Sequence, residues 1–178
     1  MNRSEVRQRH AIKVAKENGA ILSFDPNIRE PLWKDMEDAR AQMAYGLSVC
    51  DILKISDNEI QWFSGKEDYT EGIHMLQQTY QIPLILLSMG KDGSRAYYKD
   101  MLVEVPAFLQ KNTIETTGAG DTFGACCLHH ILKYGLDNLT KQQLKEMLTF
   151  ANAAASIITT RKGALRVMPS LEEIQRLL

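Results

Sequence analysis

Hydrophobic residues recur at helical spacing along much of this chain. An apolar position every three or four residues gives a helix one face that can pack on a core. Ser56 stands three residues before Glu59, and Thr140 stands three before Gln143, which is the spacing of a capping box at a helix start. Gly19 is a stop signal after the first helical pattern. Helices are therefore predicted over 4–18, 35–48, 69–80, from Asp121 to Tyr134, along a long segment after Thr140, and after Ser170.

Short apolar runs separate these helical patterns. The run at 84–88 is continuously apolar, which is typical of a parallel strand buried on both faces. Residues 94–98 and 102–105 alternate polar and apolar side chains around Lys99-Asp100, and this pattern predicts an antiparallel hairpin at a sheet edge. Further strands are predicted at 20–24 and 51–55. Strands that alternate with helices indicate an α/β layered domain with about five strands and helices on both faces.

A glycine-rich loop precedes the predicted helix that begins near Asp121. Gly118 and Gly120 allow the main chain to curl and to approach a ligand without a side-chain clash. Backbone N–H groups at a helix start lack partners, and the helix dipole is positive there, so the loop suits an anion. Asp121 falls in the first turn, where a carboxylate can accept a proton from an attacking hydroxyl. This arrangement suits phosphoryl transfer, with Asp121 as the base.

Other interpretations of this loop remain open from the residues alone. A glycine-rich turn with an aspartate placed for the helix dipole is common and needs no ligand. A dinucleotide site is less favoured, because the third glycine, Gly124, has the wrong spacing and no clear strand precedes the loop.

Polar residues follow two of the predicted strands. Asp25, Asn27 and Arg29 come directly after the run at 20–24, and ligands of open α/β sheets bind beyond such strand ends. A simple turn is the alternative, since proline and asparagine are frequent in turns. Glu59 lies after the run at 51–55, and its capping-box spacing gives it a structural role without a ligand.

The loop and its neighbours resemble one family. Residues 116–123, Thr-Thr-Gly-Ala-Gly-Asp-Thr-Phe, resemble the C-terminal signature of the ribokinase-like (PfkB) carbohydrate kinases, and most closely that of the fructokinases. Residues 25–29 with the following Leu-Trp resemble a fructokinase motif, and residues 88–93 resemble the family's Thr-x-Gly-x-x-Gly nucleotide loop with serine for threonine. Glu115 and Cys126 depart from the family pattern, where Asp and a small residue are usual.

The resemblance implies ATP and Mg²⁺ as cofactors and a sugar, most closely fructose, as substrate. It places N–H groups of the base loop in an anion hole, sets Asn27 and Arg29 near substrate or phosphate, and gives Glu59 a magnesium role through water. The residues it places in the anion hole are Gly118, Ala119 and Gly120. The residues it places around ATP are Ser88, Gly90, Gly93, Thr117, Asn152 and Gly163. From the residues alone, Asn152 is more simply one polar position on a small-residue helix.

Composition limits the kinds of ligand and partner that the sequence predicts. A net charge of −1 gives no electrostatic reason to expect nucleic acid or an anionic membrane. The three cysteines, two of them adjacent, imply no disulfide framework and no zinc site, so a reducing cytoplasm is expected. His129 and His130 diverge on a helix and make poor joint metal ligands.

The resemblance covers nearly all of the 178 residues but little more than half of the family's length. We expect a single domain over 1–178, the nucleotide-binding portion, without the lid and most of the sugar contacts. An uncovered sheet edge then favours self-association or pairing with a separate N-terminal half. Two alternatives to a fructokinase-like activity stay open: a kinase for 2-keto-3-deoxygluconate-type sugar acids, and a module that binds ATP or a partner without catalysis.

Overall fold

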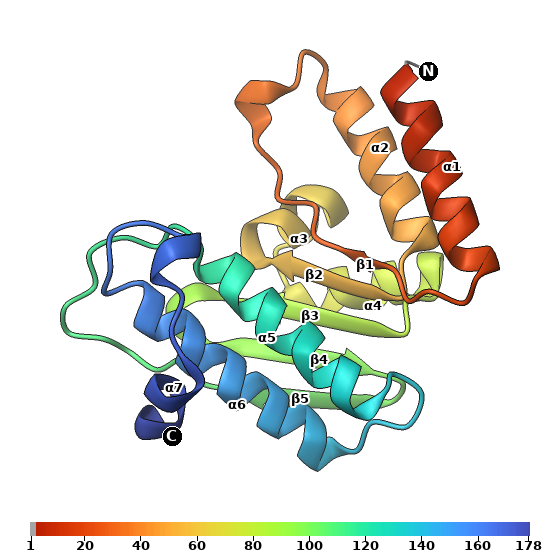
Figure 1. The fold of residues 1–178 in the computed structure, drawn as a ribbon. Helices are drawn as coiled ribbons and strands as arrows, with labels where there is room; N and C mark the ends of the chain where they lie inside the picture. Colours follow the sequence, from red (N-terminus) through yellow and green to blue (C-terminus); the bar gives the residue numbers. More distant parts are fainter. Residues whose placement is uncertain (1–2) are drawn as a thin grey trace. The chain divides into compact units, whose positions relative to one another are not determined.

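The computed structural model describes residues 3–178. These residues divide into two compact units, one up to Leu86 and one from Leu87 to Leu178, and the strand β3 (Leu84–Ser88) crosses from one to the other. Five strands form one mixed sheet in the order β1-β2-β3-β4-β5 (Figure 1). The prediction of a single domain stays a prediction.

The first unit contains two short parallel strands and four α-helices. Ser23 pairs with Ile52 and Phe24 with Leu53, so β1 runs parallel to β2. The elements in chain order are α1 (Arg3–Glu17), β1 (Ser23–Phe24), the 3₁₀ helix η1 (Glu30–Leu32), α2 (Met36–Val49), β2 (Ile52–Ser56), α3 (Asp57–Ser64) and α4 (Tyr69–Tyr80).

Side-chain caps mark the starts of three helices of this unit, and the sequence predicts the one at Ser56. Asp35 caps α2, Asp68 caps α4, and Ser56 with Glu59 forms a complete capping box on α3. Gly65 ends α3 in the left-handed conformation. The core between these elements is formed by fully buried aliphatic side chains, among them Leu47, Leu53, Ile60, Ile73 and Leu76.

The second unit contains an antiparallel hairpin and two long helices. Ser94 pairs with Val105 and Tyr97 with Leu102, which confirms the predicted hairpin. In Figure 1, α5 and α6 lie side by side over this hairpin, and they form the largest helix contact of the unit. Its elements after β3 are η2 (Gly90–Asp92), β4 (Ser94–Tyr98), β5 (Met101–Val105), α5 (Ala119–Tyr134), α6 (Lys141–Ile158), η3 (Leu165–Val167) and α7 (Leu171–Leu177).

Small side chains allow α6 to pack closely. Ala151, Ala153 and Ala154 are completely buried, and Phe123, Cys127 and Ile131 of α5 are nearly so. Close packing of this kind holds the beginning of α5 in a fixed place relative to the end of α6, and the candidate site lies at these two helix ends.

Two predictions of detail are wrong. The strand predicted over 20–24 is regular only at Ser23–Phe24, because Leu22 bonds to β2 irregularly: its N–H donates to the Asp51 carboxylate and its carbonyl accepts from two successive N–H groups. The apolar face predicted for the last helix is buried only at Ile174. Leu171 and Leu178 are 60% and 57% exposed, since no described residue covers them.

In the part of the chain that the structure describes, no helix is both long enough and apolar enough to cross a membrane.

Candidate functional site

The start of α5 is built differently from the starts of the other α-helices whose N-caps the structure describes. Its N-cap is Gly118, which has a left-handed φ of 78° and offers no side-chain oxygen to the first turn. The Ala119 N–H donates to the Thr116 carbonyl, but the N–H groups of Gly120 and Asp121 have no acceptor in residues 3–178. Side chains cap five other helices, namely through Asp35, Ser56, Asp68, Thr140 and Ser170.

Asp121 lies in the first turn of α5, as the sequence predicts. Its carboxylate is exposed and forms no hydrogen bond or ion pair within the described residues. A carboxylate with free lone pairs beside unpaired N–H donors can accept a proton while the donors hold an anion.

A pocket of about 320 Å³ opens beside this loop, within the second unit. It brings together several predicted nucleotide residues with part of the base loop. The predicted site residues that line it are Ser88, Gly90, Gly93, Ala119, Gly120 and Asn152. Thr117, Gly118, Asp121 and Gly163 do not line it. The pocket wall is mostly apolar, with Phe108, Leu109 and Phe123 among its members, as suits a flat aromatic base above a polar phosphate end.

Asn152 has a fully engaged carboxamide. Its oxygen accepts from the Ser94 hydroxyl at 2.9 Å, and its nitrogen donates to the carbonyls of Val105 and Pro106 at 3.1 Å each. These bonds hold the chain that leaves β5 against α6, so Asn152 shapes the wall of the pocket. Sequence spacing does not predict this role, because the three partners lie about fifty residues away.

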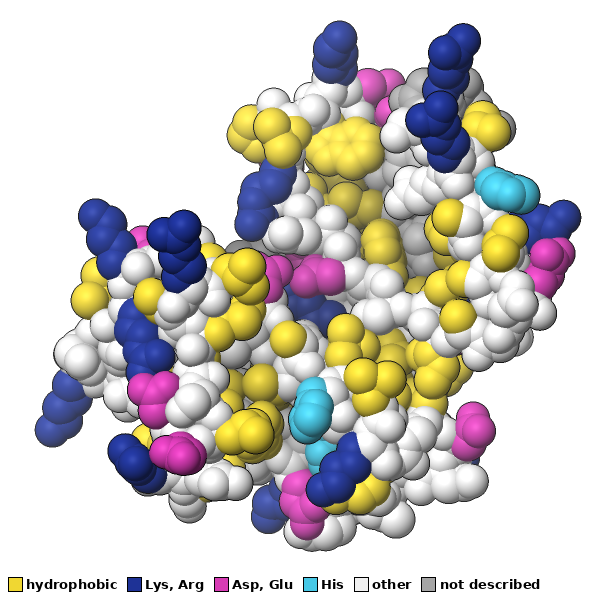
Figure 2. All heavy atoms as spheres, viewed as in Figure 1, with side chains coloured by type: hydrophobic (Ala, Val, Ile, Leu, Met, Phe, Trp, Pro, Cys, Tyr) yellow, Lys and Arg dark blue, Asp and Glu magenta, His cyan; other side chains and the backbone are white. Residues whose placement is uncertain are grey.

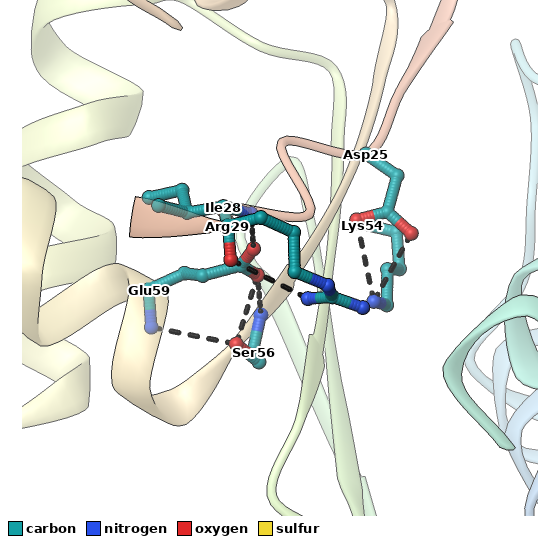
Figure 3. Close-up of polar contacts among 6 residues, drawn as sticks. All are labelled: Asp25, Ile28, Arg29, Lys54, Ser56 and Glu59. Carbon is teal, nitrogen blue, oxygen red and sulfur yellow. Dashed lines mark hydrogen bonds and ion pairs between the residues drawn. The ribbon is translucent and has the colours of Figure 1, made fainter. Parts of the chain in front are cut away.

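The loop after β1 carries the other predicted residues, in the first unit. Asn27 has a left-handed φ of 44°, which asparagine tolerates, and it is exposed. Arg29 is also exposed, and its guanidinium donates only a long 3.4 Å bond to the Ile28 carbonyl (Figure 3). The guanidinium therefore has donors left for an anionic ligand.

Glu59 holds this loop to the start of α3. One carboxylate oxygen accepts from the Ile28 N–H at 2.8 Å, and the other accepts from the N–H and the hydroxyl of Ser56 (Figure 3). Three donors leave about one free lone-pair position on this carboxylate. In residues 3–178 no group of three or more His, Cys, Asp or Glu side chains could hold a metal ion.

One functional candidate was missed from the sequence. Lys54 of β2 is buried and pairs with Asp25, with its Nζ 3.1 Å from the nearer carboxylate oxygen (Figure 3). The pair ties the end of β1 to β2 and places a positive charge beneath the 25–29 loop. A single lysine inside an apolar strand run was the available signal, because an unpaired lysine is seldom buried.

The cysteines of α5 are poor nucleophiles. Burial raises the pKa of the Cys126 thiol to about 11, and it also raises the pKa of the Cys127 thiol well above its usual value. Both thiols are therefore protonated near neutral pH. His130 is half-buried and contacts Tyr134 in a tilted arrangement, with the ring centroids 4.6 Å apart.

Comparison with known proteins settles the family. The sequence profile of the pfkB family carbohydrate kinases matches residues 4–171. The chain belongs to the pfkB carbohydrate kinase family. It is 38% identical to a probable fructokinase-2 of Arabidopsis thaliana over 90% of its own length and 48% of that protein, and 36% identical to fructokinase-1 of Zea mays over 94% and 52%. The chain thus spans about half the length of these relatives.

Solved structures confirm the ribokinase-like α/β fold. The fructokinase of Vibrio cholerae O395, in its form with fructose, ADP and calcium, superposes with a TM-score of 0.90 at 28% identity, over 99% of this chain and 56% of that one. A ribokinase II from E. coli with ATP and Mg²⁺ superposes with a TM-score of 0.80 at 25% identity, over 95% of this chain and 52% of that one.

Proposed function

We propose that this pfkB-family chain is the nucleotide-binding portion of a fructokinase-like kinase, which transfers the γ-phosphoryl group of ATP to a sugar hydroxyl. The observation that supports it is the uncapped start of α5, where two unpaired N–H groups, the free Asp121 carboxylate and the pocket adjoin. Asp121 takes the proton of the attacking hydroxyl, and the N–H groups of Gly120 and Asp121 receive the charge of the transferred group.

ATP fits the pocket with its base against the apolar wall and its phosphates toward Gly120. Ser88, Gly90 and Gly93 flank the nucleotide from the β3–η2 turn. Mg²⁺, when bound, neutralises phosphate charge, and Glu59 is the residue of this chain proposed to order its water. Thr117 and Gly163, which do not line the pocket, are proposed to act on the nucleotide only through the loop. The predicted cytoplasmic location stays a prediction.

Fructose is the proposed acceptor, with Asn27 and Arg29 as contacts on the 25–29 loop. A sugar acid of the 2-keto-3-deoxygluconate type is the second candidate, because the exposed Arg29 guanidinium has donors left to pair with a carboxylate.

The test is sugar-dependent ADP release by the 178-residue chain with ATP and Mg²⁺, beside the variant Asp121→Asn. We expect Asp121→Asn to lower turnover by about 100-fold to 10,000-fold, the usual share of a general base, with nucleotide affinity nearly unchanged. Asp137→Asn is the matched control, since Asp137 is an exposed aspartate beyond the other end of α5. Equal turnover in Asp121→Asn would remove Asp121 from the mechanism. ATP binding without any turnover would favour the non-catalytic module, and faster turnover with the sugar acid would change the substrate.

We also propose a polypeptide partner for the first unit, namely a chain equivalent to the other half of the relatives' length. In this unit α1 buries none of its described residues, and a groove of about 630 Å³ runs along α1, β1 and α2. Hydrophobic side chains, including Phe24, Trp33 and Met43, line it, and Figure 2 shows such side chains in the hollow beside these helices. Among the strands of residues 3–178, β1 stands at the end of the order, so its outer edge has no described strand beside it.

Light scattering during gel filtration tests this partner. We expect the chain to associate with itself when alone and to become a one-to-one complex when it is co-expressed with the other half of a fructokinase. A compact monomer that is stable to dilution and does not bind the added half would contradict the proposal. A dimer that does not bind the added half would favour a homo-oligomer instead.

A further inference from the structure

The base loop is tied to the chain that leaves α6. The N–H groups of Ile114 and Glu115 both donate to the Thr159 carbonyl, at 2.8 and 3.3 Å. The Glu115 carboxylate then reaches the turn beyond α6 and accepts the Gly163 N–H at 2.6 Å. These three bonds join two segments that are more than forty residues apart in sequence.

The loop also touches this turn directly. A Cβ built on Gly118 would lie 3.1 Å from the Ala164 Cβ and 3.2 Å from the Ile158 side chain. The backbone of the N-cap therefore rests on the residue that follows Gly163. Any movement of the turn changes the place of Gly118, and with it the direction of the Gly120 and Asp121 N–H groups.

The turn itself is held from its other side. Arg161 donates to the Val167 carbonyl at 3.1 Å, which closes the turn, and it forms an ion pair with Glu173 of α7. The 161–167 turn is thus anchored to α7, and Glu115 is the side chain that connects this anchored turn to the loop.

We infer that Glu115 is a positioning residue, which holds the loop 116–121 against the Gly163–Ala164 turn and so aims its N–H groups at the terminal phosphate of the nucleotide. The part of this inference that concerns the phosphate rests on the proposed function. The hydrogen bond from Gly163 to Glu115 is observed independently of that function. The bond requires an acceptor oxygen at the end of a side chain of this length. It does not require a negative charge.

This distinction defines two variants. Glu115→Gln keeps the length and one carbonyl oxygen, so it should preserve the bond. Glu115→Ala leaves the half-buried Gly163 N–H without its acceptor. Glu104→Ala is the matched control, because Glu104 forms an ion pair with Arg95 on the hairpin of the same unit.

The first measurement is binding of ADP and of a non-hydrolysable ATP analogue by titration calorimetry. We expect Glu115→Ala to weaken the analogue about tenfold relative to ADP, the scale of one lost hydrogen bond to a charged group, while Glu115→Gln and Glu104→Ala keep the wild-type ratio. An equal loss for both nucleotides would mean a merely structural role. If Glu115→Gln loses as much analogue binding as Glu115→Ala, then the negative charge matters. Each of these two results would overturn the inference.

The second measurement needs no nucleotide. Amide hydrogen exchange should become about tenfold faster over 115–122 and 163–167 in Glu115→Ala and stay unchanged in Glu115→Gln. Unchanged exchange in Glu115→Ala would refute the tie between the two segments. If the wild-type chain binds neither nucleotide while exchange responds as expected, the proposed function fails and the positioning contact stands.

Discussion

The loop before α5 and the loop before η1 differ in how their polar groups are satisfied. At the start of α5, Gly118 provides no cap, and the N–H groups of Gly120 and Asp121 remain without acceptors in the described chain. In the 25–29 loop, Glu59 satisfies the Ile28 N–H, and Lys54 pairs with Asp25. Unsatisfied donors cost stability unless water or a ligand meets them. The first loop therefore leaves donors for water or a ligand, whereas the second satisfies its polar groups within the chain.

The largest effect is expected from Gly118→Ala. A side chain there is strained by the left-handed φ, at about 1–2 kcal/mol, and also collides with Ala164. Nucleotide affinity should fall together with the free energy of unfolding, measured by calorimetry and by urea titration. Gly135→Ala at the other end of α5 is the control, since Gly135 has the same φ of 78° but no atom within 4 Å of the new Cβ.

Gly135 combines its φ of 78° with a ψ of 171°, a region open almost only to glycine, so Gly135→Ala should lower stability by about 1–3 kcal/mol and leave nucleotide affinity unchanged. If Gly118→Ala and Gly135→Ala lose the same nucleotide affinity, then the contact of Gly118 with the turn does not organise the anion site. The difference drawn above between the loops before α5 and before η1 would then be weaker.

An effect of the opposite kind, on stability and not on nucleotide binding, is expected from Glu59→Ala. Three donors lose their acceptor, so the free energy of unfolding should fall by about 2–3 kcal/mol without any nucleotide present. Glu71→Ala removes another first-turn glutamate of this unit, whose ion pair with Lys66 is exposed, and should cost less than about 1 kcal/mol. Wild-type stability in Glu59→Ala, with a loss only of magnesium-dependent ATP binding, would instead make the magnesium role the main one.

The smallest effect concerns the anchor of the 161–167 turn. The Ser170 N–H and Arg161 lower the pKa of Glu173 from its ordinary value of 4.5. A lowered folded-state pKa gives stability that is present above the unfolded value and is lost as the pH falls through the folded one. As the pH falls below about 4.5, the unfolding temperature of the wild type should therefore drop more steeply than that of Glu173→Gln.

Glu172→Gln is the control for this pH dependence, because Glu172 lies next to Glu173 and forms only an exposed ion pair with Arg176 among the described residues. A slope in Glu173→Gln equal to that of the wild type would show that this carboxylate does not anchor the turn.

Local signals determined much of this molecule from the sequence alone. Side-chain caps at Ser56, Thr140 and Ser170, the buried run at 84–88 and the alternating hairpin all depend on neighbours within a few residues, and all are confirmed. The family also followed from the motif at 116–123, since glycines and an aspartate at a helix start carry their chemistry locally.

Only the tertiary structure decided what the polar residues touch. The bonds of Asn152 to Ser94 and Val105, of Glu59 to Ile28, and of Glu115 to Gly163 join segments about thirty to sixty residues apart. Sequence spacing reports which face of a helix or strand a side chain occupies, because those periods are local. The partner that a side chain meets on a distant segment depends on how the elements pack. The hydrogen bonds that hold the site residues in place are therefore visible only in the tertiary structure.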